Sequence, residues 1–140
     1  MFQAQDMTAK FFGAYEHSLD VKGRLTLPAK YRIQLGDKCF VTRSQYEDRC
    51  LVIWASDDFY SFANSWQAQD LSDPTLRWKM RIWASEAFDA EIDKTGRLPL
   101  PQALRRFANL DKEVLVHGAI GTIELWNPEN WSSPLLRSES

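Results

Sequence analysis

Two short segments of the chain combine an acidic residue, a glycine and an arginine in the same order. A glycine in a tight turn can adopt a positive φ and lets a ligand approach the backbone closely. Arginine and lysine are the side chains that neutralise phosphates, so such a turn could contact nucleic acid. The residues are Asp20, Lys22, Gly23 and Arg24 in the first segment and Asp93, Lys94, Gly96 and Arg97 in the second.

A purely structural role accounts for the same spacing. Asp20 and Asp93 each stand four residues before an arginine, so the carboxylate could accept a guanidinium hydrogen bond or cap the turn. Local charge favours a phosphate contact, because residues 18–32 carry four positive side chains and one negative. The residues alone leave both roles open.

The two segments belong to a longer internal repeat. Residues 18–32 align with residues 91–105 without a gap, at an offset of 73, and seven of the 15 positions are identical. The similarity continues to Leu51–Trp54 and Ile123–Trp126 at a slightly different offset. We infer a tandem duplication of a unit of about 45 residues.

Each repeat predicts a ββαββ unit followed by the start of a helix. Apolar residues alternate on both sides of Gly23, which is typical of two strands joined by a tight turn. Pro28 and Gly36 are typical of the start and the left-handed stop of a short helix, and Pro101 and Asn109 take the same places in the second repeat. Two further strands follow in each repeat, over residues 40–43 and 50–54 and over residues 114–117 and 122–126.

The segment between the repeats predicts two helices. Asp73 and Pro74 are typical of a helix start. An apolar stripe at helical spacing is expected to lie in the core or in a subunit interface rather than to bind a cofactor. The stripes are Phe59, Phe62 and Trp66 in the first helix and Leu76, Met80 and Trp83 in the second.

The composition is that of a soluble globular chain. It has 140 residues, of which 44% are hydrophobic and 26% are charged. Seventeen Lys and Arg against 19 Asp and Glu give a net charge of -2, so nucleic-acid binding requires a local basic patch. No apolar run is long enough to cross a membrane, and the first residues do not resemble a secretory signal. We expect a cytoplasmic protein with no membrane partner.

Few residues suit catalysis or metal binding. His17 and His117 are expected to be surface or strand residues, and the acidic side chains of residues 86–93 to be exposed. Cys39 and Cys50 are expected to be buried thiols in adjacent strands, although a disulfide or a reactive thiol is the alternative. We therefore expect no enzymatic activity, catalytic residue, cofactor, metal or small-molecule substrate.

The sequence closely resembles the MraZ family over residues 11 to about 131. The resemblance rests on Phe12-Gly13, on residues 18–32 and, in the second half, on residues 81–87, 93–101 and 116–126. It implies a bacterial transcriptional regulator of the AbrB-like, swapped-hairpin superfamily. Such proteins assemble into rings and bind repeated boxes upstream of their own operon in the division and cell-wall gene cluster.

The resemblance also implies roles for individual residues. Arg24 and Arg97 would contact DNA, with Lys22 and Lys94 as supporting phosphate contacts, while the aspartates and glycines shape the turns. The expected partners are double-stranded promoter DNA and further copies of the chain in a ring, at the nucleoid. Operator binding is expected to weaken far more in Arg24→Ala than in Arg105→Ala.

The expected fold class is α+β, with two tandem AbrB-like half-domains that form a pseudo-two-fold β-barrel core and a two-helix connector. The expected divisions are an N-terminal extension (1–10), a first DNA-binding unit (11–58), the connector (59–86), a second DNA-binding unit (87–131) and a C-terminal tail (132–140). The function expected from the resemblance is repression of the protein's own operon. The alternative is an antitoxin-type interaction module whose aromatic connector binds another protein.

Overall fold

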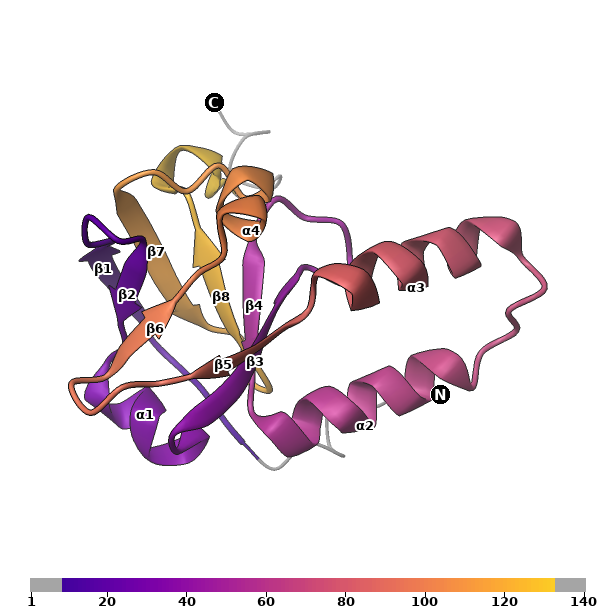
Figure 1. The fold of residues 1–140 in the computed structure, drawn as a ribbon, viewed down its shortest axis with the longest axis horizontal. Coiled ribbons are helices and arrows are strands. Elements are labelled where there is room, and N and C mark those ends of the chain that lie inside the picture. The colour runs from indigo at the N-terminus through magenta and orange to yellow at the C-terminus, as the bar shows by residue number, and fades with distance from the viewer. Residues whose placement is uncertain (1–8, 133–140) are drawn as a thin grey trace.

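The computed structural model describes residues 9–132, so most of the expected N-terminal extension and nearly all of the expected tail lie outside the described residues. The fold class is α+β, with a mainly antiparallel sheet (Figure 1). The strands are β1 (Ala14–Ser18), β2 (Arg24–Thr26), β3 (Lys38–Arg43), β4 (Leu51–Trp54), β5 (Phe88–Glu91), β6 (Arg97–Pro99), β7 (Glu113–Gly118) and β8 (Ile123–Trp126). The α-helices are α1 (Ala29–Leu35), α2 (Ser56–Gln67), α3 (Pro74–Glu86) and α4 (Gln102–Phe107), and a 3₁₀ turn, η2, covers Pro128–Asn130.

The two repeats share one sheet of six strands in the order β1-β7-β8-β4-β3-β5. The predicted hairpins β3–β4 and β7–β8 are confirmed, and both are antiparallel. β4 also pairs with β8, which joins the hairpin of one repeat to the hairpin of the other. The sheet is therefore built jointly by the two repeats.

The pairing expected at the start of each repeat is wrong in part. β1 pairs along its whole length with β7, and β5 pairs with β3, so neither forms a ladder with the strand that follows its turn. The two arms of the first turn are joined by the isolated bridge between Leu19 and Leu25 and by a 2.9 Å hydrogen bond from the Asp20 N–H to the Arg24 carbonyl, which is too short a pairing to form a ladder. Leu25 and its counterpart Leu98 are completely buried. Burying both against each other favours pairing between the repeats over a local hairpin.

β2 and β6 pair with each other in a separate two-stranded ladder. Leu25 lies opposite Leu98, Arg24 opposite Pro99 and Thr26 opposite Arg97. The offset of 73 residues exchanges the members of these pairs, so each repeat occupies the same position relative to the other. Beyond the ladder, the Leu27 N–H donates to the Gly96 carbonyl at 2.9 Å, and the Leu100 N–H donates to the Gly23 carbonyl at 3.3 Å. The turn of each repeat is thus supported by the strand end of the other.

The short helices α1 and α4 begin and end as the sequence predicts, within one residue. Pro28 and Pro101 lie immediately before the first helical residue rather than at it. Gly36 has a φ of 76° and Asn109 a φ of 55°, which confirms both left-handed stops.

The connector forms the two predicted helices, which extend to one side of the sheet (Figure 1). The Asp73 side chain accepts a 2.9 Å hydrogen bond from the Thr75 N–H and caps α3, as expected. Trp83 stacks on Phe59 with a centroid distance of 5.2 Å and meets Trp54 of β4 edge-on at 6.1 Å. The predicted apolar stripes are therefore confirmed as a second core between α2, α3 and the sheet.

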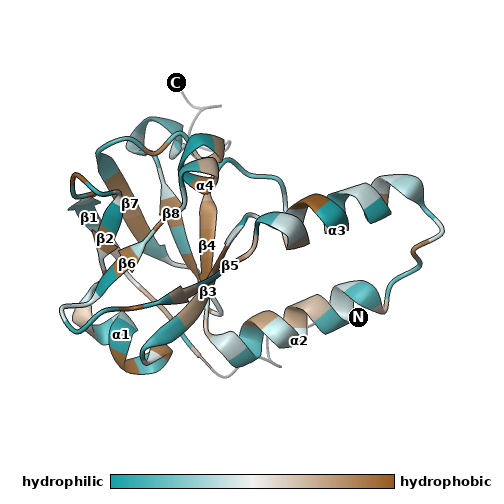
Figure 2. Ribbon diagram, in the orientation of Figure 1, coloured by the Kyte–Doolittle hydropathy of each residue, from teal (hydrophilic) through white to brown (hydrophobic). Residues whose placement is uncertain are grey.

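The main core lies between the sheet, the β2–β6 ladder and the short helices. Figure 2 shows hydrophobic residues along β4 and β7, in the interior of the sheet. Cys39 and Cys50 are free and buried, as expected, and burial raises the pKa of Cys39 to about 12. Between residues 9 and 132, every helix is too short or too polar to cross a membrane.

Candidate nucleic-acid interface

The first turn, residues 20–24, is organised by the carboxylate of Asp20. One carboxylate oxygen accepts hydrogen bonds from the backbone N–H groups of Lys22 and Arg24, both at 2.9 Å. The other accepts a bond from Arg24 Nε at 2.8 Å. Gly23 has a φ of 74° and donates its N–H to the Asp20 carbonyl. The aspartate thus fixes both the turn and the direction of the arginine.

The second turn, residues 93–97, repeats this geometry. Asp93 accepts hydrogen bonds from the backbone N–H groups of Thr95 and Arg97 at 2.9 Å, and from Arg97 Nε at 2.8 Å. The Thr95 hydroxyl adds a further bond at 2.8 Å. Gly96 has a φ of 84°. The common geometry shows that the shared residue pattern encodes one local structure in both repeats.

Each aspartate stabilises its turn, and the arginine that it binds nevertheless remains at the surface. Each ion pair engages Nε of the arginine, whereas the terminal nitrogens of Arg24 and Arg97 donate to none of the described residues. About a quarter of the Arg24 side chain and two fifths of the Arg97 side chain are accessible, 27% and 39%. The outer edge of each guanidinium is therefore available to an anion.

Hydrogen bonding lowers the pKa of both aspartates. The backbone N–H of Arg24 contributes most to the lowered pKa of Asp20, with the guanidinium of the same residue adding to it. The backbone N–H of Arg97 has the same effect on the pKa of Asp93. Both carboxylates stay ionised and keep their arginines oriented at neutral pH.

A second arginine covers each turn, and it comes from the other repeat. A Cβ atom built on Gly23 would lie 2.7 Å from Cζ of Arg105, and one built on Gly96 would lie 2.6 Å from Cζ of Arg32. Arg105 Nε donates to the Leu100 carbonyl at 2.9 Å. The positive φ favours glycine at both positions, and a Cβ atom at either would displace the guanidinium that lies over it.

Arg105, with which the sequence analysis compares Arg24, therefore belongs to the surroundings of the first turn. Arg105 lies against the first turn and Arg32 against the second, where an Arg32 terminal nitrogen lies 3.4 Å from the Lys94 carbonyl. Sequence reasoning missed both residues as members of the site. The internal repeat could have identified them, because Arg32 and Arg105 are identical residues at the same aligned position.

Each turn thus gathers three cations and one carboxylate. We call these groups the basic turn clusters. Lys22 and Lys94 are exposed, and both turns lie on the side of the molecule away from α2 and α3 (Figure 1). The first cluster consists of Asp20, Lys22, Arg24 and Arg105, and the second consists of Asp93, Lys94, Arg97 and Arg32.

The other titratable residues considered in the sequence are dispersed. His17 lies in β1, whereas His117 lies in β7 and stacks on Trp131 at 3.9 Å; burial lowers the pKa of His117. Glu86 forms an ion pair with Arg43 at 2.6 Å. Within residues 9–132, no three His, Cys, Asp or Glu side chains gather in a way that could hold a metal ion.

Together, the fold and the clusters define a duplicated α+β protein with an arginine-bearing turn in each half. A family model described as "MraZ protein, putative antitoxin-like" matches the chain twice, over residues 10–82 and 83–139. These matches cover nearly the whole sequence, and the chain belongs to the MraZ family.

The packing of Arg105 on Gly23 can be measured with a double-mutant cycle. Gly23→Ala and Arg105→Ala should destabilise the protein non-additively, with a coupling of about 1 kcal/mol, because the added methyl group displaces a guanidinium that the second variant lacks. Urea unfolding of the four proteins measures this coupling. Gly96→Ala combined with Arg105→Ala is the matched control and should be additive, because Arg32 covers Gly96. Equal coupling in both cycles would contradict the exchange of arginines between the repeats.

The lowered pKa values of Asp20 and Asp93 predict acid sensitivity of the turns. A carboxyl group whose pKa lies below its ordinary value of 3.8 stabilises the folded state above that value. This stability is lost as the pH falls from about 5 towards 2. Asp93→Asn should therefore show a shallower decline of unfolding free energy over this range than the wild type. Asp111→Asn, at an exposed position without a hydrogen bond to a described residue, should follow the wild-type decline. Parallel curves for all three proteins would contradict the prediction.

Proposed function

We propose that this protein is a sequence-specific DNA-binding transcriptional regulator and that its two basic turn clusters contact the DNA. The observation that carries the proposal is the same in both repeats. An aspartate holds Nε of an arginine, the outer edge of that arginine stays available, and a lysine and a second arginine lie beside it. Membership in the MraZ family fits a regulatory role.

The distribution of charge supports contact through the turns. The chain has a net charge of -2, so general attraction cannot hold a polyanion. Each cluster nevertheless has two more cations than carboxylates. Arginine can donate two parallel hydrogen bonds to guanine or to a phosphate, and prior orientation reduces the entropy lost on binding.

The exchange between repeats supports an AbrB-like, pseudo-two-fold barrel within one chain. β2 pairs with β6 in a register that interchanges equivalent residues, and each turn is supported by the other repeat. In this proposal a single polypeptide supplies both halves of the DNA-binding unit. The two turns lead into β2 and β6, lie at opposite ends of the β2–β6 ladder, and in this proposal form one DNA-binding surface.

Repeated promoter boxes and a ring of subunits complete the proposal. One chain offers only two turns, whereas several chains in register with repeated boxes gain affinity through effective concentration. A head-to-tail interface closes into a ring when the rotation between subunits permits it. Tyr60, Trp78 and Ile82 are exposed large side chains of the connector and are candidates for that interface. We propose that the ring represses its own operon in the division and cell-wall cluster, at the nucleoid.

Binding to the DNA upstream of the protein's own reading frame tests the role of the arginines. Arg24→Gln and Arg97→Gln should each weaken binding about tenfold or more, because a guanidinium that reads a base contributes about 1–3 kcal/mol. Arg49→Gln, which removes an exposed arginine that stacks on Phe107 outside the clusters and the connector, is the matched control and should bind like the wild type.

The same titrations, followed by fluorescence anisotropy at several salt concentrations, give a second readout. The logarithm of affinity should fall with the logarithm of salt concentration by about 0.9 for each phosphate contacted. Lys22→Gln should reduce this slope by about one unit. A response independent of salt, or equal losses in Arg24→Gln and Arg49→Gln, would contradict DNA binding through the turns.

The antitoxin-type alternative is favoured by the description of the family model and by the exposed Tyr60 and Trp78. In that case the connector binds a different protein. Size-exclusion chromatography with light scattering separates the two functions. The ring predicts a high-order oligomer of the chain alone, and Trp78→Ala should shift it towards smaller species. A monomeric wild type would favour a missing partner and contradict the ring.

A further inference from the structure

The face of the large sheet against which α2 and α3 pack is covered in the first repeat and open in the second. Phe40 lies opposite Trp54 in the first repeat, and both are buried beneath the connector. The equivalent pair in the second repeat is Leu115 opposite Trp126, and both side chains are partly exposed. After β4 the chain continues into α2 and α3, whereas after β8 the described residues form only the single turn η2. Among the described residues, no α-helix therefore covers Leu115 and Trp126 as the connector covers their counterparts.

The side chains on the uncovered half form one continuous surface, which we call the open face. Val52 of the covered half lies directly opposite Glu124, so both halves belong to the same face of the sheet. Trp131, which follows η2, stacks on His117 and meets Trp126 edge-on, and it remains half exposed. Aromatic side chains surrounded by polar ones are typical of protein–protein interfaces. The open face consists of Ala14, Glu16, Leu115, His117, Glu124, Trp126 and Trp131.

The open face carries negative charge. Its charged side chains are Glu16 and Glu124, and it contains no lysine or arginine. Glu124 accepts a 2.9 Å hydrogen bond from Trp126 Nε1. Glu16 is exposed, and its carboxylate makes no hydrogen bond or ion pair with a described residue. An acidic surface repels DNA and favours a partner that carries a cation beside apolar side chains.

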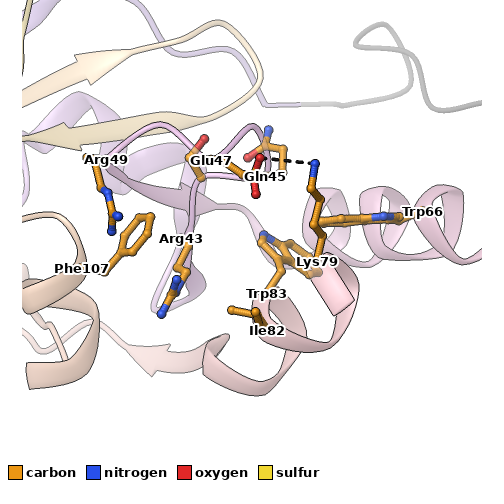
Figure 3. A pocket seen from close by; sticks show the side chains of 10 residues that line it. Arg43, Gln45, Glu47, Arg49, Trp66, Lys79, Ile82, Trp83 and Phe107 are labelled. Atoms are coloured by element: carbon orange, nitrogen blue, oxygen red, sulfur yellow. Dashed lines mark ion pairs between the residues drawn. The ribbon is translucent and has the colours of Figure 1, made fainter. Parts of the chain in front are cut away.

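The outward side of α3 has the complementary character. Trp78 and Ile82, one helical turn apart, are exposed to 61% and 43%. Lys79 pairs with Glu47 of the β3–β4 loop at 3.3 Å, and Figure 3 shows this ion pair together with Ile82. Arg81 lies 5.0 Å from the centre of the Trp78 ring and forms no ion pair with a described residue. One helix thus presents two apolar side chains and an uncompensated cation.

We propose that the open face binds α3 of a second copy of this chain. Trp78 of one copy packs against Trp126 of the next, and Arg81 pairs with Glu16. Because α3 and the open face are different surfaces of one chain, the contact is head-to-tail and can repeat from copy to copy. Each connector then lies between two sheets, its own and its neighbour's. The inference rests on the ring in the proposed function, for which it names the surface that meets the connector.

Size-exclusion chromatography with light scattering of the full chain, without DNA, tests the pairing of Arg81 with Glu16. Arg81→Glu and Glu16→Arg each bring like charges together and should shift the high-order oligomer towards smaller species. The double variant restores opposite charges in the reversed order, so it should regain the molar mass of the wild type. Because a second charge reversal does not repair a misfolded chain, this recovery separates the contact from a loss of structure.

Glu91→Arg is the matched control and should keep the wild-type mass. Glu91 is also an exposed acidic residue of an edge strand, but it lies on β5, outside the open face. Wild-type mass in Arg81→Glu or Glu16→Arg, or a double variant no larger than the single variants, would overturn this contact without contradicting the ring or DNA binding by the turns. A monomeric wild type would overturn the ring and this contact together.

Discussion

The pairing of β2 with β6 is the contact on which the rest of the structure depends. It buries Leu25 against Leu98 and joins two repeats that also share the large sheet. The pairing also brings the strand end of each repeat to the turn of the other, where Leu27 and Leu100 donate to the glycine carbonyls. Each turn is thus shaped by its own aspartate and then covered and supported by residues of the other repeat.

This constraint explains how a chain with a net negative charge concentrates arginine at two points. An aspartate within each turn binds Nε of one arginine. A second arginine comes from the short helix of the other repeat, Arg105 of α4 at the first turn and Arg32 of α1 at the second. α4 carries Arg105 against the first turn, so the position of this guanidinium depends on how the six-residue helix packs.

Local patterns in the sequence predict local structure well. The helix stops at Gly36 and Asn109, the Asp73 cap and the connector stripes all follow from short-range chemistry and are confirmed. The predictions that fail concern contacts between residues that are far apart in the sequence. Nothing near Leu25 indicates that its strand pairs with residues 97–99 rather than with its neighbour, since a buried apolar strand accepts either partner. Arg105 was missed for the same reason, because its contact with Gly23 spans more than half of the chain.

We propose that the two turns bind duplex DNA as one unit, which is repeated around an assembly of subunits. Hydroxyl-radical footprinting of the region upstream of the protein's own reading frame tests it most directly. We expect short protected patches of DNA at a constant spacing, one for each bound subunit. A single unbroken protected stretch without periodicity would contradict the proposal. So would the absence of protection at protein concentrations that saturate binding in the anisotropy titrations.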